Sequence, residues 1–339
     1  VIGCGTVAKV HAYHFIEKGV KVVGFSDISD QQLLKFRELF GDVKTYTDYK
    51  EMIENEKPNV VSICTPPVLH KEQVLYCAER GIDILCEKPI STDLQALKEM
   101  VEMCKKSGVT LGIMLPRRYY NNSKATKNVL EKNLLGKLKE VSFILNCNKG
   151  QDYYQTTWRG KKESTGGGVL MSQSIHSIDQ LIYMLGLKPV AVKGKVRTTR
   201  SYLEIEDEAE GEIEFENGLR VKIKASANSD RLWQGITTLK GEKGIIILDS
   251  AKTLAWEFPQ NEEPISFPEE ENEKVPEKIK PIYYGPGHQK VIHDFIHSLE
   301  EGSRHRVEAE NSIDAMKVII GIYKSSENGG CWINLSELK

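Results

Sequence analysis

The sequence predicts an α/β protein in which a doubly wound parallel sheet is followed by an α+β domain with an open, mainly antiparallel sheet. In the first part, short apolar runs alternate with segments long enough for helices, which is typical of parallel strand–helix–strand units. In the second part, strand-like segments are separated by turn signals such as Glu216-Asn217-Gly218, which indicates antiparallel hairpins. A chain of 339 residues is expected to form two domains, and we place them at 1–117 and 118–339.

The first part begins with a glycine-rich turn that only Val1 and Ile2 precede. A buried parallel strand spans about five or six residues, so we expect a few residues of the first strand to lie before Val1. A helix is expected directly after the turn. Further strands are expected at 20–27, 59–64, 83–86 and 110–114, with helices at 68–80 and 92–107.

The second part carries its strands close together along the chain. They are expected at 139–147, 190–199, 208–216, 219–227, 234–240 and 244–250. The stretch 257–286 is rich in proline and acidic residues and predicts a long surface loop. Two amphipathic helices, at about 287–301 and 309–327, are expected to close the chain.

Composition excludes several classes of function. With 40% hydrophobic and 28% charged residues, the chain resembles an ordinary soluble globular protein, and its net charge of −2 predicts no nucleic-acid or membrane partner. No apolar run approaches the roughly 20 residues that a membrane span needs. The cysteines are scattered without a C-x-x-C pair, so we expect reduced thiols, a cytoplasmic location and no metal site.

The opening turn, Val1-Ile2-Gly3-Cys4-Gly5-Thr6-Val7-Ala8, has the spacing of a dinucleotide-binding corner. Gly3 permits the tight turn, Gly5 removes a side chain that would block the phosphates, and Ala8 allows close packing of the helix on the strand. The helix that begins after Thr6 and Val7 directs backbone N–H groups toward the anion. A similar corner also occurs in proteins without such a ligand.

The strand at 20–27 ends in Asp27, near the offset at which an acid hydrogen-bonds the adenosine ribose. A carboxylate there favours free ribose hydroxyls and repels a 2′-phosphate, and no arginine occurs before Arg37, so we expect NAD rather than NADP. The alternative is that Asp27 only caps the helix expected from Gln31.

Glu87-Lys88-Pro89 follows the strand at 83–86, at the strand end where open α/β sheets bind their ligands. A lysine at this position can hold a substrate hydroxyl and stabilise the charge of a developing alkoxide. The alternative is a solvent-facing lysine ahead of a helix.

A second glycine-rich segment, Gly166-Gly167-Gly168, precedes a helix that contains His176. Ser172, Gln173 and His176 are expected on one face, together with Asp179 or Gln180. A histidine there suits proton transfer at neutral pH, and the alternative is a hydrogen-bonded histidine without a catalytic role. The apolar residues recur at helical spacing and predict a buried stripe of Met171, Ile175, Ile178, Ile182 and Leu185.

Together, these elements resemble one family. The glycine-rich turn, Asp27, Thr65-Pro66-Pro67, Glu87-Lys88-Pro89 and the helix with His176 occur in the order and spacing of the Gfo/Idh/MocA family (glucose–fructose oxidoreductase, inositol dehydrogenase and MocA). The resemblance continues through Gly287-His288-Gln289 and the closing helices, so it covers essentially the whole chain.

The resemblance implies an NAD(P)-dependent oxidoreductase that transfers hydride and assembles as a homodimer or homotetramer through its C-terminal sheet. Lys88 matches the family's active-site lysine, His176 matches its catalytic histidine, and the Lys88–Pro89 bond is expected to be cis. Cofactor contacts are expected from Gly3, Gly5, Thr6, Val7, Asp27, Thr65, Pro66, Pro67, His70, Glu87 and Lys88. Substrate contacts are expected from Arg118, Tyr153, Trp158, Arg159, Ser172, Gln173 and His288.

Ser172 departs from many family members, which carry an aspartate four residues before the histidine. The pair Ser172-Gln173 is similar to a subgroup with Asn-Gln, which includes sugar-nucleotide dehydrogenases acting at C3 of a hexuronate. This argues against an inositol-type substrate, and we expect hydride transfer at a secondary hydroxyl carbon of a sugar, cyclitol or sugar nucleotide. Two alternatives stay open: a dihydrodiol- or bilin-type reductase of the same family, and a non-catalytic NAD-binding sensor.

Overall fold

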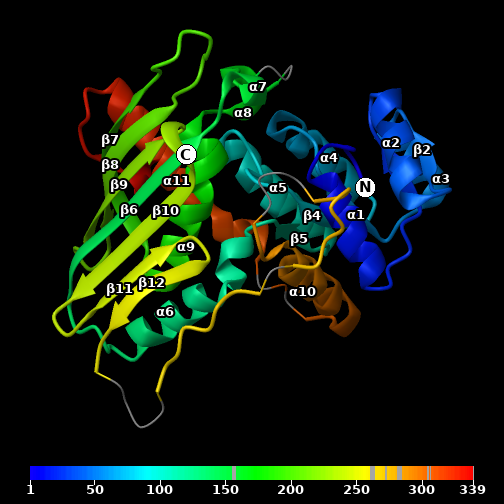
Figure 1. Ribbon diagram of the computed structural model, residues 1–339. Helices are drawn as coiled ribbons and strands as arrows, with labels where there is room; N and C mark the ends of the chain where they lie inside the picture. The colour runs from blue at the N-terminus through cyan, green and yellow to red at the C-terminus, as the bar shows by residue number, and fades with distance from the viewer. Residues whose placement is uncertain are drawn as a thin grey trace. The chain divides into compact units, whose positions relative to one another are not determined.

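The chain folds into two compact units, shown in the ribbon diagram of Figure 1. The computed structural model describes residues 1–154, 158–259, 264–271, 273–280, 285–303, 305 and 307–338. The first unit comprises Val1–Ser91, Ala96–Pro116 and Asn272–Asn311, and the second comprises Thr92–Gln95, Arg117–Glu271 and Ser312–Lys339. The first unit therefore contains a segment far beyond residue 117, and the division into domains 1–117 and 118–339 stays a prediction.

A parallel sheet forms the centre of the first unit, as predicted. Its described strands are β1 (Gly24–Ser26), β2 (Lys44–Tyr46), β3 (Val60–Ile63), β4 (Asp83–Cys86) and β5 (Leu111–Ile113). Ile2 makes parallel bridges to Ser26 and to Ile63, so it joins the pair β1–β2 to the group β3–β4–β5. The resulting order, β2-β1-Ile2-β3-β4-β5, is that of a doubly wound nucleotide-binding sheet.

Helices alternate with these strands. They are α1 (Ala8–Glu17), α2 (Asp30–Phe40), α3 (Tyr49–Glu56), η1 (Pro67–Leu69), α4 (His70–Ala78), α5 (Leu94–Ser107), α10 (His288–Glu301) and η4 (Ala309–Ser312). Helix α1 presents Ala8 and Ala12 to the buried side chains of Cys4, Phe25 and Phe36, so small residues allow it to approach the sheet closely. Helix α2 is capped by the hydroxyl of Ser29, which accepts the N–H of Gln32.

The second unit is built on an eight-stranded sheet in the order β12-β11-β10-β6-β9-β8-β7-β13. Its strands are β6 (Leu138–Asn148), β7 (Pro189–Arg197), β8 (Glu208–Phe215), β9 (Arg220–Ser226), β10 (Asn228–Gly241), β11 (Ile245–Asp249), β12 (Lys252–Glu257) and β13 (Ile333–Asn334). Only the central pair β6–β9 is parallel, so the sheet is mixed and mainly antiparallel. The sequence did not predict β12, whose side chains are mostly exposed, or the two-residue β13.

Helices α9 and α11 lie against one face of this sheet (Figure 1). Phe143 and Ile223 of the sheet are buried, and so are Ile178 of α9 and Ile322 of α11. The helical segments of this unit are η2 (Pro116–Tyr119), α6 (Asn121–Glu131), α7 (Gln151–Tyr154), α8 (Lys162–Thr165), η3 (Leu170–Ser174), α9 (Ile175–Leu185), α11 (Ile313–Glu327) and η5 (Leu335–Glu337). The predicted loop at 257–286 is irregular where it is described, and 260–263, 272 and 281–284 lie outside the described residues.

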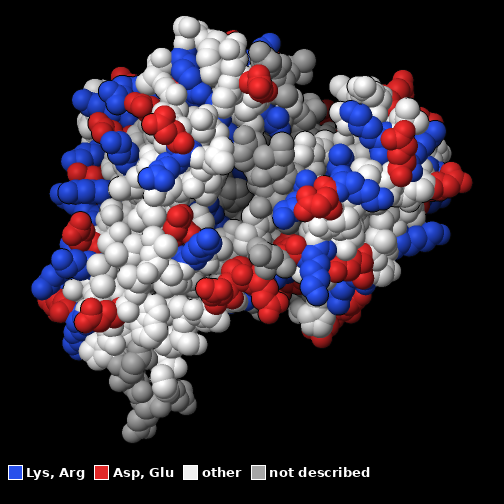
Figure 2. Space-filling view, viewed as in Figure 1, with Lys and Arg blue, Asp and Glu red and all other residues white. Residues whose placement is uncertain are grey.

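The surface and the thiols agree with the composition. On the face drawn in Figure 2, basic and acidic side chains are interspersed, in keeping with the small net charge. All seven cysteines are free thiols. Among the described residues, no helix combines the length and apolar character that a membrane crossing requires.

Candidate active site

The glycine-rich turn combines one tightly packed glycine with one open glycine. Gly3 has a φ of 86°, and a Cβ there would lie 2.9 Å from the backbone carbonyl of Cys64, so the local fold itself requires glycine. Gly5 is exposed, and a Cβ on it would meet no protein atom within 4 Å. Protein packing therefore does not explain Gly5, and the open space beside its backbone is what close approach of a dinucleotide would require.

The start of helix α1 and Asp27 supply the polar groups at this turn. Val7 is the N-cap residue of α1 and gives no side-chain cap, which leaves the first N–H groups suited to an anion. Asp27 accepts the N–H of Cys4 at 2.7 Å and the N–H of Ser29 at 2.9 Å, so its carboxylate is fixed beside the turn. The residues present fit a dinucleotide: the helix start, with Thr6 and Val7, would hold its phosphates and Asp27 a ribose hydroxyl.

Thr65-Pro66-Pro67 follows β3 and leads into η1 and α4. The ring of His70 is fully buried, with Nε2 at 2.9 Å from the carbonyl oxygen of Thr65 and Nδ1 at 3.2 Å from that of Ile90. Burial lowers the pKa of His70 and favours the neutral ring. Because a neutral imidazole carries one N–H, His70 donates to only one of these two carbonyl oxygens.

The end of β4 places Glu87 and Lys88 side by side, and the Lys88–Pro89 bond is cis, as expected. Glu87 is buried, and its Oε1 lies 3.0 Å from Nε2 of His11, whose Nδ1 lies 2.8 Å from the hydroxyl of Ser62. Burial opposes the charged form of both partners. Even so, the neighbouring Cys64 and Glu87 raise the pKa of His11 to about 10, and His11 lowers the pKa of Glu87. This ion pair joins the middle of α1 to the strand end that carries Lys88.

His288 begins helix α10 in the same unit. Its Nδ1 lies 3.3 Å from the carbonyl oxygen of Gly285. Burial lowers the pKa of His288, and the charges of Glu87 and Glu273 oppose this shift. His288 therefore shares its electrostatic environment with Glu87, a predicted cofactor residue.

In the second unit, the triple-glycine segment is explained by close packing. A Cβ on Gly167 would lie 2.1 Å from the hydroxyl of Tyr323, and a Cβ on Gly168 would lie 1.7 Å from the carbonyl oxygen of Glu206. The carboxylate of Glu206 accepts the N–H groups of Gly168 at 2.7 Å and Leu170 at 3.0 Å, and the hydroxyl of Tyr323 at 2.8 Å. Burial raises the pKa of Glu206, although these hydrogen bonds oppose the shift.

His176 lies in the first turn of α9, directly after the π-helical turn η3. Such π turns occur frequently at functional sites. Ser172 donates its hydroxyl to the carbonyl of Gly168 at 2.6 Å, so part of its hydrogen-bonding capacity is used within the turn. Gln173 is buried and donates to the hydroxyl of Tyr153 at 3.2 Å.

Tyr153 is the centre of a cationic and aromatic cluster that unites four of the predicted substrate residues. The guanidinium of Arg159 lies 4.7 Å from the centre of the Tyr153 ring and 4.8 Å from that of Trp158, and Gln173 bonds the Tyr153 hydroxyl. The ammonium of Lys149 lies 5.0 Å from the Tyr153 ring. Lys149 is only 2% exposed, and burial lowers its pKa.

Arg118, also a predicted substrate residue, forms an ion pair with Asp179. Its guanidinium donates to both carboxylate oxygens of Asp179, at 2.6 to 3.1 Å, and both side chains are buried. The neighbouring Arg117 donates to Ser177 and Gln180. Asp179 and Gln180, of which one was expected on the polar face with His176, are both buried and hydrogen-bonded to these arginines.

Three further residues of these sites, His11, Glu206 and Lys149, were not predicted from the sequence. His11 falls in a helix whose composition gave no reason to select it, and its partner Glu87 lies 76 residues away. Glu206 precedes β8, 38 residues after the glycine that it contacts. Lys149 follows the alternating strand β6, where a lysine is ordinarily exposed. Each of these residues contacts partners that lie far away in the sequence, and the periodicity of the sequence does not predict such contacts.

Comparisons with known proteins agree with this geometry. Residues 1–114 match the Gfo/Idh/MocA oxidoreductase family in its NAD-binding Rossmann fold, and residues 127–335 match the C-terminal alpha/beta domain of the same family. The chain is 28% identical to D-glucoside 3-dehydrogenase of Escherichia coli strain K12, over 64% of this chain and 66% of that protein. It is 29% identical to myo-inositol 2-dehydrogenase of Thermotoga maritima, over 55% and 54% respectively. The matches thus span between about half and two thirds of these relatives.

A solved structure of the WlbA dehydrogenase from Bordetella pertussis, in complex with NADH and UDP-GlcNAcA, superposes with a TM-score of 0.85. The alignment covers 98% of this chain and 97% of that one at 22% identity, so it shows a shared fold. The family matches cover both parts of the chain and include the glycine-rich turn, Lys88 and His176. The chain belongs to the Gfo/Idh/MocA family of NAD-binding oxidoreductases.

Proposed function

We propose that the chain transfers hydride between NAD and a secondary hydroxyl carbon of a sugar, cyclitol or sugar nucleotide. The cluster around Tyr153 carries this proposal, because it unites Gln173, Trp158 and Arg159 close in sequence and space to the helix of His176. Aromatic faces suit the apolar faces of sugar rings, and amide and guanidinium groups suit hydroxyl or acidic substituents. Curated relatives in the same family act on a glucoside and on an inositol.

The roles of the two central residues follow from their chemistry. NAD, when bound, supplies the hydride acceptor or donor. His176 takes the hydroxyl proton during oxidation and returns it during reduction, as a half-buried imidazole can at neutral pH. Lys88 polarises the substrate oxygen and stabilises its negative charge. Gln173 and, to a smaller extent, Ser172 orient neighbouring hydroxyls.

The cofactor preference rests on Asp27. Its carboxylate is held beside the glycine-rich turn by two backbone N–H groups, and a 2′-phosphate would meet this negative charge. NAD is therefore proposed over NADP. A dihydrodiol- or bilin-type reductase and a non-catalytic sensor are the competing functions, and the measurement of turnover separates them from the proposal.

The test compares four proteins on an NAD-linked panel of sugars, cyclitols, sugar nucleotides and diols. We expect His176→Ala and Lys88→Ala each to lower turnover by at least about 100-fold, as the loss of a proton-transfer or oxyanion group does. His297→Ala is the matched control, since His297 is exposed and pairs only with Glu301 in the described structure. NAD affinity of His176→Ala should stay within a few-fold of the parent. Turnover retained by both variants, or tight NAD binding without nicotinamide reduction on any compound, contradicts the proposal.

We also propose that the chain assembles as a homodimer or homotetramer through the sheet of the second unit, in the cytoplasm. Three large apolar side chains of this sheet are exposed, namely Ile144 on β6 and Leu254 and Trp256 on β12. Seven free cysteines suit a reducing compartment. Light scattering on Trp256→Glu should show a smaller particle than the parent, and an unchanged mass would contradict this interface.

A further inference from the structure

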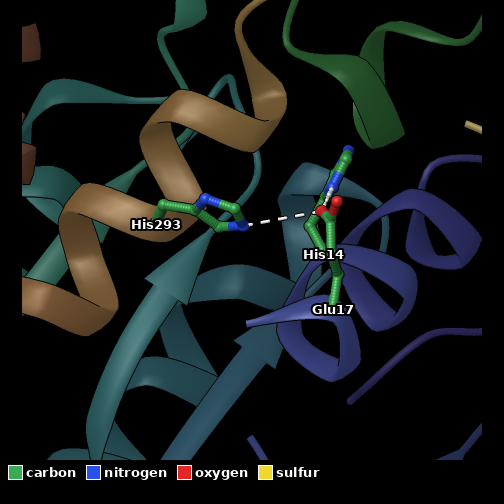
Figure 3. Close-up of side chains that lie close together, drawn as sticks. All are labelled: His14, Glu17 and His293. Carbon is green, nitrogen blue, oxygen red and sulfur yellow. Dashed lines mark hydrogen bonds and ion pairs between the residues drawn. The ribbon is translucent and has the colours of Figure 1, made fainter. Parts of the chain in front are cut away.

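A cluster of titratable side chains on α1 and α10 has no part in the proposed reaction. It consists of His14 and Glu17, one helical turn apart on α1, and His293 on α10. All three belong to the first unit. Figure 3 shows the ring of His293 pointing from its helix toward Glu17 and His14. We propose that these three residues bind a zinc ion that joins α1 to α10.

The distances between the ligand atoms suit such an ion. Nδ1 of His14 lies 2.9 Å from Oε2 of Glu17, and Nε2 of His293 lies 3.6 Å from the same oxygen. The three ligand atoms all lie within 4.8 Å of one another. Zinc binds nitrogen and oxygen at about 2.0–2.2 Å in tetrahedral geometry, which separates neighbouring ligand atoms by roughly 3.3 Å. Side-chain adjustments of about an ångström would bring the cluster to this geometry.

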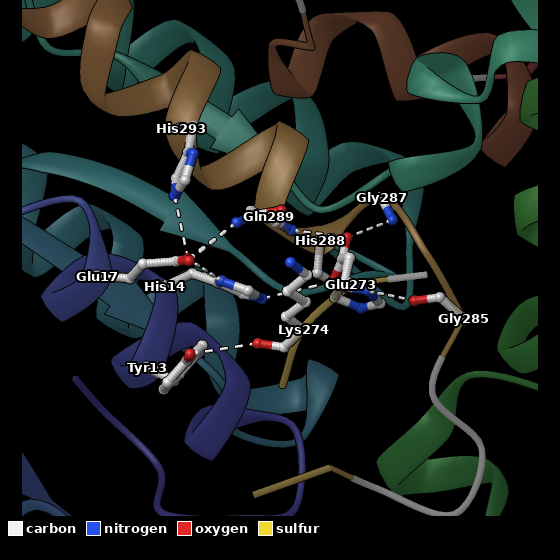
Figure 4. A network of polar contacts seen from close by, with 10 residues as sticks. All are labelled: Tyr13, His14, Glu17, Glu273, Lys274, Gly285, Gly287, His288, Gln289 and His293. Carbon is white, nitrogen blue, oxygen red and sulfur yellow. Dashed lines mark hydrogen bonds and ion pairs between the residues drawn. The ribbon is translucent and has the colours of Figure 1, made fainter. Parts of the chain in front are cut away.

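Two neighbouring side chains hold the proposed ligands by polar contacts, as the partners of metal-binding residues do in zinc proteins. Glu273 Oε2 lies 3.4 Å from Nε2 of His14, so a carboxylate faces the ring nitrogen opposite the proposed metal-binding one. Gln289 donates to Glu17 at 3.0 and 3.1 Å. This arrangement, drawn in Figure 4, fixes the ring and the carboxylate in place. Carboxylate–histidine–metal triads of this kind orient the ligand and increase its basicity.

The supporting elements are held together independently of any ion. The backbone N–H groups of Gly287 and Gln289 both donate to Glu273, which anchors the segment before α10. Val10 of α1 packs with Val275 and Ile279 of the same segment. The ligand side chains therefore project from two helices in fixed contact, which preorganises the site.

The types of ligand atom indicate which metal ion the three residues would bind. Two imidazoles and one carboxylate suit zinc, whereas calcium and magnesium prefer sets made only of oxygen. The side chain of His14 is fully buried, but those of Glu17 and His293 are 34% and 31% exposed, which leaves room for water as a fourth ligand. A cation here also lies near the C-terminal end of α1, where the helix dipole favours positive charge.

The cluster has one competing interpretation. His14 can bridge Glu17 and Glu273 by hydrogen bonds alone, and the site would then bind no zinc. In the described structure the Nε2 atom of His293 is itself inaccessible to solvent, although the side chain is partly exposed, and it faces Glu17 without a hydrogen bond. Without a metal, this nitrogen has only the 3.6 Å ion-pair contact with Glu17, which is longer than a hydrogen bond, whereas a metal ion would use it as a ligand.

Zinc titration of the full chain, without an affinity tag and after removal of metal by a chelator, tests the proposal. In competition with a chromophoric chelator, we expect one zinc per chain, and binding weaker by more than about tenfold in Glu17→Gln and in His293→Ala. His297→Ala, on the exposed face of the same helix, is the matched control and should bind as the parent does. Absence of stoichiometric zinc in the parent, or equal affinity in the variants, overturns the site.

Further measurements show whether the variants are folded and whether a cysteine, rather than the three proposed ligands, binds the metal. Circular dichroism of the metal-free variants checks the fold. Zinc should raise the Tm of the parent and of His297→Ala, and leave that of the ligand variants unchanged. Cobalt in place of zinc should give a visible ligand-field spectrum that His293→Ala loses. Thiolate-to-cobalt charge-transfer bands would show that a free cysteine binds instead, and would overturn the proposal.

Discussion

At Gly5 an added methyl group would meet no protein atom within 4 Å, whereas at Gly168 it would lie 1.7 Å from the carbonyl oxygen of Glu206. Each glycine lies in a glycine-rich turn that leads into a helix. The turn of Gly5 precedes α1 and lies beside Asp27, and the turn of Gly168 precedes η3 and α9, which carries His176. The first corner leaves space that a cofactor can fill, and the second is filled by the protein itself. Glycine at a corner therefore has two distinct physical causes, and only the position of the surrounding atoms separates them.

The two corners also differ in the buried glutamate that supports each one. Glu87 faces His11, and this partner lowers the pKa of Glu87 despite its burial. Glu206 receives neutral donors from Gly168, Leu170 and Tyr323, so burial dominates and raises its pKa. The first glutamate forms an ion pair and the second acts as a hydrogen-bonded cap, and the two should respond differently to substitution and pH.

The largest expected effect is that of Gly168→Ala. The new methyl group cannot avoid Glu206, because the colliding atom belongs to the backbone, so we expect the free energy of unfolding to fall by at least about 3 kcal/mol. Gly150→Ala is the matched control in the same unit, since a Cβ there meets nothing within 4 Å. Urea unfolding followed by circular dichroism measures both. Equal stability of the two variants would remove the packing explanation of the second corner.

A pH effect of intermediate size is expected from the first corner. The folded-state pKa of His11, about 10, exceeds its ordinary value of 6.5, so the stabilisation is complete below pH 6.5 and is lost as the pH rises to about 10. Between pH 7 and pH 9 the free energy of unfolding should fall by up to about 2.7 kcal/mol, since one pKa unit corresponds to about 1.4 kcal/mol.

Urea unfolding at pH 7 and pH 9 measures this slope. Glu87→Gln removes one of the two groups, with Cys64, that raise the pKa of His11, so the slope should become shallower, while His297→Ala should keep that of the parent. A parent protein whose stability does not change between these pH values would show that His11 is neutral in the fold, and the ion pair would be wrong.

The smallest effect is expected from Gly5→Ala. Stability should stay within about 0.5 kcal/mol of the parent, because the methyl group enters open space. The Kd for NAD should rise by about tenfold or more if the pyrophosphate lies against this backbone, because the methyl group would occupy the same space. Fluorescence titration with NADH gives this Kd. Unchanged affinity would mean that the open glycine does not serve the cofactor.

The sequence predicted most of what depends on local pattern. Alternation of strands and helices predicted the parallel sheet, and turn signals predicted the strands from β6 to β11. The helix of His176 was also expected, but its first turn is π-helical. Burial of Asp179 could not be predicted, since it depends on Arg118, 61 residues earlier. The same holds for Glu206, because a capping carboxylate distant in sequence leaves no periodic signal.

Because Asn272–Asn311 belongs to the first unit, this unit can complete its folding only late in synthesis. Helix α10 and the segment that carries Val275 and Ile279 complete the packing around Val10, yet they are made after most of the second unit. A ribosome that has released only residues 1–117 therefore presents an unfinished nucleotide-binding unit with exposed apolar surface. A fragment truncated at residue 117 would lack the same segment, so expression of the nucleotide-binding part alone should yield a chain dependent on chaperones.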